Sequence, residues 1–360
     1  MAHGPVEPFK IGFLNEGMFD AEAFDLSVGR AIRLRFEEAY ASGLIDRPVE
    51  LVFASGYGLP SGTAKAVEDA WMELKEAGVL GILGPGITDN CIAVKPLFEA
   101  HKVATINFPG TVLSRGEYGF HYQLGALYED GPICARAIER KGLTEVAVIR
   151  DRGPIGQEFF EYFVDQCEMS GLSVISDQVV SPITTDLTSQ VAKAKASNAQ
   201  ALVYLGFGGI LGELSDAIAE AGWTVPRYTC TAGLHWYSKT PEERTNLKGW
   251  IYVDMVDEEN PVMQHMMREF KSRWDMDGFN PIFGVGYDMA TLAVLALHYA
   301  PVYTTEGFKQ GLEKIHHVPS VLGGKGTVMG FGPHERTALK GPDYLLLREM
   351  DLETTHRYKG

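Results

Sequence analysis

Short apolar runs alternate with longer amphipathic segments along most of the chain. Apolar residues three or four positions apart, such as Phe24, Val28 and Ile32, predict helices, and apolar runs of about four to eight residues predict buried strands. Because strands and helices alternate, the pattern predicts an α/β protein with parallel sheets and right-handed crossovers. The strands are expected at residues 10–14, 49–54, 79–83, 103–107, 145–150, 173–180, 201–205, 227–231 and 249–255, and the helices at 24–42, 63–77, 91–100, 132–140, 157–171, 187–197 and 212–221.

The alternation falls into two series, which indicates two domains. The first series ends near residue 122, and the stretch 125–131 leads into the second. The pattern breaks again at residues 255–261, and two long helices are expected at 261–274 and 281–300. A Gly-rich tail and a strand at 343–350 follow. A chain of 360 residues is also too long for one ordinary hydrophobic core.

Composition and charge narrow the possible partners. Hydrophobic residues make up 45% and charged residues 22%, which are ordinary globular values. The net charge is −15 and no block of Lys and Arg offsets it, so nucleic acid and anionic lipid are disfavoured. We expect no membrane-spanning segment, because no uninterrupted apolar run is long enough. The N-terminus lacks an export-signal pattern, so either the protein is cytoplasmic or its signal is missing from this chain.

Motifs for metal binding, cofactor binding and catalysis are weak. The cysteines are far apart in the sequence and are expected to be buried free thiols, with one disulfide left open: Cys91, Cys134, Cys167 and Cys230. Adjacent side chains such as His316 and His317 point apart, so they do not predict a metal site. Gly206–Gly209 lacks the glycine spacing of a dinucleotide-binding loop. We therefore expect no metal, no cofactor and no enzymatic activity.

The stretch GILGPGITDN, residues 81–90, is the first candidate for a binding site. An apolar run stops at Gly84-Pro85-Gly86, and a helical pattern starts soon after. Ligands of open parallel sheets bind beyond the carboxyl ends of the strands, where helix N-termini present free N–H groups. Gly86 would let the backbone approach a ligand, and Thr88 and Asn90 could donate hydrogen bonds to it. The alternative is that Thr88, Asp89 and Asn90 only cap the helix.

Five segments in order carry a resemblance to a known family. They are KIGFLNEG (10–17), residues 80–111, residues 145–163, residues 184–207 and GVGYDMATLAVLAL (284–297). Together they resemble type I periplasmic-binding-fold proteins, in particular the leucine/isoleucine/valine-binding branch of ABC-transporter solute-binding proteins. The resemblance implies two Rossmann-like lobes joined by three crossing strands, with a ligand cleft between them. Carried over, lobe 1 is 1–122 plus 255–330, and lobe 2 is 123–254 plus 331–360.

The resemblance also implies which loops meet the ligand. They are 15–19, 86–90 and 108–111 in lobe 1, and the loops after Arg150, Leu205 and Thr231 in lobe 2. Thr88, Gly110 and Thr111 match positions that hold the carboxylate in amino-acid binders. Where those proteins place a Glu for the ammonium, this chain has Ala232-Gly233-Leu234-His235. A buried ammonium without a carboxylate is costly, so we do not expect an α-amino acid.

We expect instead a carboxylate or another polar-headed ligand with an apolar or aromatic body. His235 either bonds the ligand or is a polar residue satisfied within the protein. The expected ligand-binding residues are Met18, Phe19, Gly86, Thr88, Asn90, Phe108, Gly110, Thr111, Ile155, Phe207, Leu234, His235 and Phe283.

By this resemblance the protein is a periplasmic or extracytoplasmic binding protein that closes about its hinge and delivers a small molecule to an ABC permease. The alternative with the same fold is a cytoplasmic ligand sensor like the amide-sensing regulators of amidase operons, which the missing export signal favours.

Overall fold

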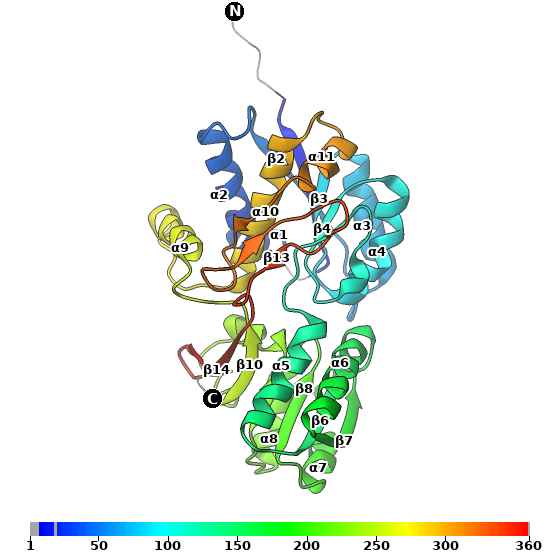
Figure 1. Cartoon of the computed structure of the whole chain (residues 1–360), viewed down its shortest axis with the longest axis vertical. Coiled ribbons are helices and arrows are strands. Elements are labelled where there is room, and N and C mark those ends of the chain that lie inside the picture. The colour runs from blue at the N-terminus through cyan, green and yellow to red at the C-terminus, as the bar shows by residue number, and fades with distance from the viewer. Residues whose placement is uncertain (1–6, 18–19, 359–360) are drawn as a thin grey trace, which may run out of the picture. The chain divides into compact units, whose positions relative to one another are not determined.

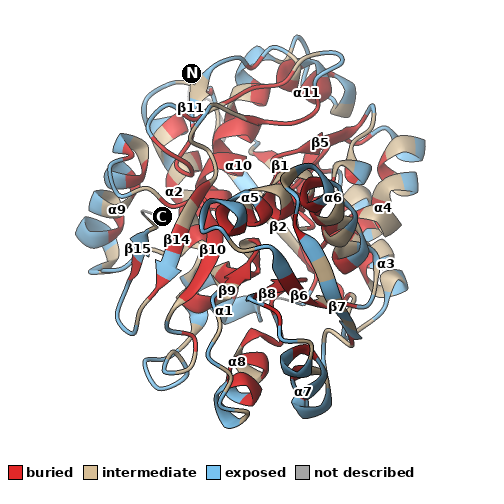
Figure 2. Cartoon of the chain, turned by 60° about the horizontal axis from the view of Figure 1, so that its bottom comes forward, coloured by how far each residue is buried: buried red, intermediate tan, exposed pale blue. Residues whose placement is uncertain are grey.

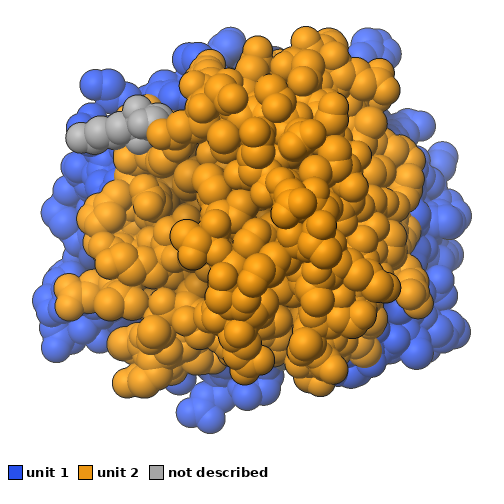
Figure 3. All heavy atoms as spheres, turned by 90° about the horizontal axis from the view of Figure 1, so that it is seen from below, with its two compact units in different colours: residues 1–124, 256–344 blue, residues 125–255, 345–360 orange. Residues whose placement is uncertain are grey.

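The computed structural model describes residues 7–17 and 20–358, which form two compact units (Figure 3). Unit 1 comprises residues 1–124 and 256–344, and unit 2 comprises 125–255 and 345–360. The chain therefore passes from one unit to the other at three places. Residues 331–344 belong to unit 1, whereas the division made from the sequence placed them in lobe 2.

Unit 1 is built on five parallel strands in the order β2-β1-β3-β4-β5 (Figure 1). Its core includes Trp71, Ile82 and Phe98, none of which is exposed. The indole N–H of Trp71 donates to the Thr105 hydroxyl at 3.2 Å, which ties α3 to β4. The strands are β1 (Phe9–Asn15), β2 (Val49–Ser55), β3 (Gly81–Leu83), β4 (Thr105–Asn107) and β5 (Gly119–His121), and the helices are α1 (Ala21–Leu26), α2 (Val28–Ala41), α3 (Ala64–Glu76), α4 (Thr88–His101), α9 (Pro261–Trp274), α10 (Pro281–Tyr299) and α11 (Thr305–Leu312).

Helix α10 is the central helix of unit 1. It is the one helix of the described residues that is long and apolar enough to cross a membrane by length and composition, and 72% of its most apolar window is buried within the protein. The expectation from the sequence that no segment spans a membrane stays a prediction, because a mostly buried core helix passes the same length and composition test. A side chain at Gly286 would run into Val28 and Ile32 of α2, so this glycine allows close helix packing.

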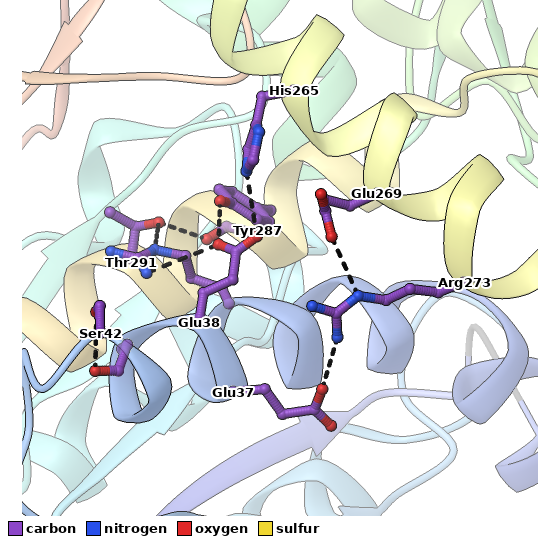
Figure 4. A network of polar contacts seen from close by, with 10 residues as sticks. Glu37, Glu38, Ser42, His265, Glu269, Arg273, Tyr287 and Thr291 are labelled. Atoms are coloured by element: carbon purple, nitrogen blue, oxygen red, sulfur yellow. Dashed lines mark hydrogen bonds and ion pairs between the residues drawn. The ribbon is translucent and has the colours of Figure 1, made fainter.

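A polar network fixes α9 and α10 to α2 (Figure 4). Glu38 of α2 accepts from the Tyr287 hydroxyl at 2.6 Å and contacts His265 of α9 at 3.2 Å. Arg273 of α9 contacts Glu37 at 2.8 Å and Glu269 at 3.2 Å. These contacts join the late helices to the N-terminal part of the same unit.

Residues 331–344 join unit 1 through main-chain hydrogen bonds. The strands β11 (Val318–Pro319), β12 (Val328–Met329) and β13 (Leu339–Lys340) form a small antiparallel sheet. The Ala338 N–H donates to the carbonyl of His121 at 2.8 Å, and the His121 N–H donates to Arg336 at 2.8 Å. This pairing with the end of β5 explains why the segment belongs to unit 1 and not to lobe 2.

Unit 2 repeats the parallel α/β arrangement around a seven-stranded sheet of order β15-β14-β10-β9-β8-β6-β7. Its inner strands β10, β8 and β6 are largely buried, whereas the edge strand β7 is mostly exposed or half-buried (Figure 2). The pairs β10–β14 and β14–β15 are antiparallel, and the other pairs are parallel. The strands are β6 (Glu145–Asp151), β7 (Ser173–Val180), β8 (Ala201–Leu205), β9 (Arg227–Thr229), β10 (Trp250–Asp254), β14 (Leu346–Met350) and β15 (Thr355–Arg357), and the helices are α5 (Leu127–Arg140), α6 (Pro154–Ser170), α7 (Thr188–Ala196) and α8 (Leu211–Glu220).

A buried ion pair holds the C-terminal strands on this sheet. Arg348 of β14 lies 3.6 Å from Asp254 of β10, and both side chains are nearly inaccessible. The hydroxyls of Tyr252 and Tyr237 donate to the same carboxylate at 2.5 and 2.8 Å. Arg348 also donates to Thr355 of β15. The four cysteines are buried free thiols, as the sequence predicts.

Candidate functional site

The topological switch point of unit 1 lies at β1, which pairs with β2 on one side and β3 on the other. In such sheets the loops that leave neighbouring strands diverge at this point and open a crevice at the carboxyl ends. The loop after β1 contains Glu16, and the loop after β3 contains Gly86 and Ile87. The structure brings these two loops into direct contact.

The Glu16 carboxylate occupies the switch point of unit 1. One oxygen accepts from the main-chain N–H groups of Gly86 and Ile87 at 2.5 and 2.8 Å, and the other accepts from the Asn90 amide at 2.8 Å. The side chain is buried, and burial raises its pKa to about 7 despite these three donors. Glu16 therefore sits where free N–H groups precede α4, at a place that favours negative charge.

The residues predicted from the sequence at this loop differ in whether their side-chain polar atoms have hydrogen-bond partners. The Asn90 side chain donates to Glu16 and to the Leu59 carbonyl, and its carbonyl accepts from the Leu59 N–H. Its role is thus to bind the loops together. Thr88 is 1% exposed, and its hydroxyl has no hydrogen-bond partner within residues 7–17 and 20–358. One Asp89 carboxylate oxygen is likewise buried and unpaired within these ranges, and burial raises the pKa of Asp89.

Phe108 lies against the same loop. Its ring fills the space that a side chain at Gly86 would need, so only glycine fits there. The Phe108 N–H donates to the Pro85 carbonyl at 3.0 Å, and its carbonyl accepts from the Leu124 N–H at 3.1 Å. These bonds align the ends of β3, β4 and β5. Gly110 is buried, and the buried Thr111 hydroxyl accepts from the Leu113 N–H at 3.1 Å.

Two residues at the end of β5 add polar groups that were not predicted from the sequence. Gln123 is fully buried, and both polar atoms of its amide have no hydrogen-bond partner in the described part of the chain. The Nε2 of His121 lies 2.6 Å from the Pro109 carbonyl, and its Nδ1 has no partner there. Burial lowers the pKa of His121 to about 4, so its ring is neutral at pH 7.

Unit 2 carries a carboxylate at the corresponding place. Asp151 ends β6, which lies between β7 and β8. Its oxygens accept from the Tyr204 hydroxyl at 2.9 Å and from the Phe207 N–H at 2.7 Å. A side chain at Gly206 would run into this carboxylate. The loop after β8 is therefore shaped around Asp151, as the loop after β3 is shaped around Glu16.

The predicted residues of unit 2 are partly exposed and mainly apolar. The rings of Phe207 and His235 meet edge to face with centroids 5.0 Å apart. Burial lowers the pKa of His235 to about 4, and a hydrogen bond with the Phe207 main chain opposes that effect. His235 is thus a hydrogen-bonded residue of the loop. Ile155 and Leu234 pack at the edge of the unit 2 core.

One predicted residue among those described stands apart from these groups. Phe283 lies in the first turn of α10 and packs on Phe270 of α9, with ring centroids 5.6 Å apart. Met18 and Phe19 lie outside the described residues. The sequence reasoning did not single out Glu16, Asp151 or Gln123, whereas Asp89 was considered with Thr88 and Asn90 as a helix cap or a site residue. A sequence signal existed for Glu16 and Asp151, because each is an acidic residue at the end of a predicted strand.

Comparisons with known proteins place this geometry in context. A family model described as periplasmic binding protein matches residues 8–337. None of the curated proteins compared with the chain matches it.

Several solved structures share the fold. A type 1 periplasmic binding protein from Bordetella pertussis Tohama I is 17% identical with a TM-score of 0.82, and the match covers 98% of this chain and 100% of that one. A leucine-binding protein from Thermotoga maritima is 17% identical with a TM-score of 0.81, covering 97% of each chain. An ABC transporter substrate-binding protein from Desulfitobacterium hafniense, in complex with Leu, is 14% identical with a TM-score of 0.75 and covers 97% and 99%. At these identities the likeness shows the fold alone.

Proposed function

Because the chain belongs to the periplasmic binding protein family, we propose that it takes up a small molecule at the carboxyl ends of its parallel strands and releases it unaltered. This proposal rests on buried polar groups that have no hydrogen-bond partner at the end of the unit 1 sheet. The Thr88 hydroxyl and the Gln123 amide are buried without partners among the described residues. Such a group costs about 1–3 kcal/mol when it stays unpaired, and a ligand that pairs with it recovers that free energy.

The ligand has a polar end and an apolar body. In unit 1 the buried Phe108 ring lies against Gly86. In unit 2 the partly exposed Ile155, Phe207 and Leu234 supply apolar surface next to the loops just described. Ligand pockets usually combine such a wall with a few placed polar groups. Two of the similar structures are a leucine-binding protein and a complex with Leu, which makes amino acids one class to test. Against that class, residues 232–235 offer no carboxylate to an ammonium. The position of the ligand between the two units stays a prediction.

The delivery step is the second part of the proposal. A structure described as an ABC transporter substrate-binding protein shares the fold, which supports handover of the ligand to an ABC permease. Such a protein acts in the periplasm or another extracytoplasmic space. Permease genes beside the gene for this chain would support delivery, whereas an adjacent regulator gene would favour the sensor alternative.

Native mass spectrometry of the purified protein, followed by a thermal-shift screen of the compounds found, tests the binding proposal. We expect one small molecule per chain, released intact by denaturation. Adding that compound at a hundredfold excess over its Kd should stabilise the folded protein by about 2.7 kcal/mol. Failure of polar-headed compounds of every class to raise the melting temperature would contradict the proposal.

A further inference from the structure

Each unit carries its own carboxylate at the strand switch point. Glu16 follows β1 and accepts the N–H groups of Gly86 and Ile87 after β3. Asp151 ends β6 and accepts the N–H of Phe207 after β8. In both units, the carboxylate comes from the first strand of the series and the donor comes from the loop after a directly paired strand. The two switch points are therefore filled in the same way.

This arrangement uses the donors that a ligand anion would need. Main-chain N–H groups before a helix are a ready place for an anionic group. In unit 1 the chain places Glu16 there, and Glu16 also takes the Asn90 amide. Asp89 lies near Glu16, because the charges of both residues act on the Cys91 thiol. Burial raises the pKa of this thiol most, and the two charges raise it further. A ligand carboxylate arriving here would be a third one beside Glu16 and Asp89.

No cation at these loops would offset that repulsion. Residues 15–17, 84–90, 108–111 and 121–124 contain neither Lys nor Arg. Arg115, whose charge acts on His121, donates to the Val112 carbonyl and the Thr337 hydroxyl. His121 is neutral at pH 7, because burial lowers its pKa to about 4. Unit 1 thus presents no free positive charge at the described ends of its strands.

The side-chain polar atoms without hydrogen-bond partners at the strand ends of unit 1 indicate which ligand group could pair with them. The Asp89 oxygen and the His121 Nδ1 can only accept hydrogen bonds, because the other His121 nitrogen donates to Pro109. The Gln123 amide both donates and accepts, and so does the Thr88 hydroxyl. A carboxylate would leave the acceptors unpaired and would be repelled by Glu16 and Asp89. An ammonium would be attracted by these two carboxylates but would leave the Gln123 N–H groups unpaired. A primary amide has both a donor and an acceptor.

We propose that unit 1 receives an uncharged, hydrogen-bond-donating end of the ligand, such as a primary amide, and that Glu16 excludes a carboxylate from this place. The inference rests on the proposed binding function and narrows its ligand class. It departs from the expectation, based on family resemblance, that Thr88, Gly110 and Thr111 hold a carboxylate. Glu16 acts as a positioning and specificity residue, since it also shapes the loop at Gly86.

Matched probes that differ only at the polar end test the inference. Isothermal titration calorimetry would compare phenylacetamide with phenylacetate and phenethylamine, and 4-methylpentanamide with 4-methylpentanoate. We expect the amide to bind at least about tenfold tighter than its acid and its amine. Tighter binding of the acid or the amine would overturn the inference and leave the binding function intact. Binding of none of the probes, or of any compound in the wider screen, would instead overturn the binding function.

Glu16→Gln tests the residue itself, with Glu22→Gln as the matched control on an exposed position of the same unit. Loss of the negative charge should raise the affinity for the acid relative to the amide at least about tenfold. Glu22→Gln should leave this ratio unchanged. An unchanged ratio in Glu16→Gln would overturn the role of Glu16.

If Glu16→Gln does not fold, the same ratio is measured on the wild-type protein at about pH 6 and pH 8, where both probes keep their charge state. Because Glu16 has a pKa of about 7, the acid should gain relative affinity at the lower pH. Asp89 and Cys91 are the titratable groups close to it, and His121 stays neutral over this range. A ratio that does not change with pH would contradict the inference.

Discussion

Replacing Glu16 by Gln should change how the stability of the protein depends on pH. The wild-type carboxyl is buried with a pKa of about 7, above its ordinary value of 4.5. The folded state therefore binds a proton more readily than the unfolded state between these two values. Stability from this group is fully present below about pH 4.5 and is lost as the pH rises through about 7.

The magnitude follows from the two pKa values. Each pKa unit corresponds to about 1.4 kcal/mol, so the contribution of Glu16 to the unfolding free energy falls by about 2.5 kcal/mol between pH 5 and pH 8. Gln keeps one acceptor for Gly86 and Ile87 but cannot titrate, so this loss disappears. Asp130 and Asp288, each with a pKa raised to about 6, act in the same direction in both proteins and cancel in the difference.

The assay is urea unfolding of wild type, Glu16→Gln and Glu22→Gln at several pH values in this range. The unfolding free energy of wild type minus that of Glu16→Gln should fall by about 2–3 kcal/mol from pH 5 to pH 8, because only wild type loses stability as Glu16 ionises. Glu22→Gln should follow the wild-type curve. A constant difference between wild type and Glu16→Gln would refute the reasoning, because it would mean that Glu16 titrates alike when folded and unfolded.

Three further substitutions have clear expected outcomes. Asp288→Ala should lower the free energy of unfolding by about 3 kcal/mol or more, because the hydroxyls of Tyr122 and Ser320 and the Val321 N–H lose their acceptor. Urea unfolding measures this change, and a loss below about 1 kcal/mol would contradict the expectation. Arg348→Ala should lower the free energy of unfolding by about 3–5 kcal/mol, because it leaves the Asp254 charge buried without its partner. Arg357→Ala, on the exposed end of β15, should change the free energy of unfolding little. Equal losses in the two variants would argue against a stabilising role of the buried ion pair. Gly86→Ala should weaken ligand binding at least about tenfold, measured by calorimetry, because the new methyl group displaces the Phe108 ring. Gly212→Ala, which meets no neighbouring atoms, is its control, and similar affinities in the two variants would count against the placement of the site.

Much of the fold could be predicted from the sequence, because it depends on local hydrophobic patterns. Each of the ten expected strands has a counterpart: the first nine correspond to β1 to β10 with β5 left out, and the one at 343–350 corresponds to β14. Strand β5 was missed because its three residues, Gly119–His121, include a single apolar side chain, and its pairing with β4 defines it. The expected helix at 24–42 divides at Ser27 into α1 and α2. Periodicity does not reveal such a break.

The site could be predicted only in part, because its contacts join residues far apart in the chain. Gly86, Thr88 and Phe108 were expected at the strand ends, and the structure brings Gly86 and Phe108 into contact. Glu16 was missed as a ligand of the loop because its partners lie 70 to 74 residues away. Asn90 fitted a helix cap or a ligand donor equally well. Its actual role as a link between Glu16 and Leu59 depends on pairing that no local pattern records.

The most direct test is calorimetric titration of the copurified compound into the wild-type protein and the variants Gln123→Ala and Gln310→Ala. Gln123 is buried with an unpaired amide, and Gln310 is exposed on α11. The account predicts one site per chain, affinity at least about tenfold weaker in Gln123→Ala and unchanged in Gln310→Ala, and recovery of the compound unaltered. Equal affinity in all three proteins, or conversion of the compound into a product, would contradict it.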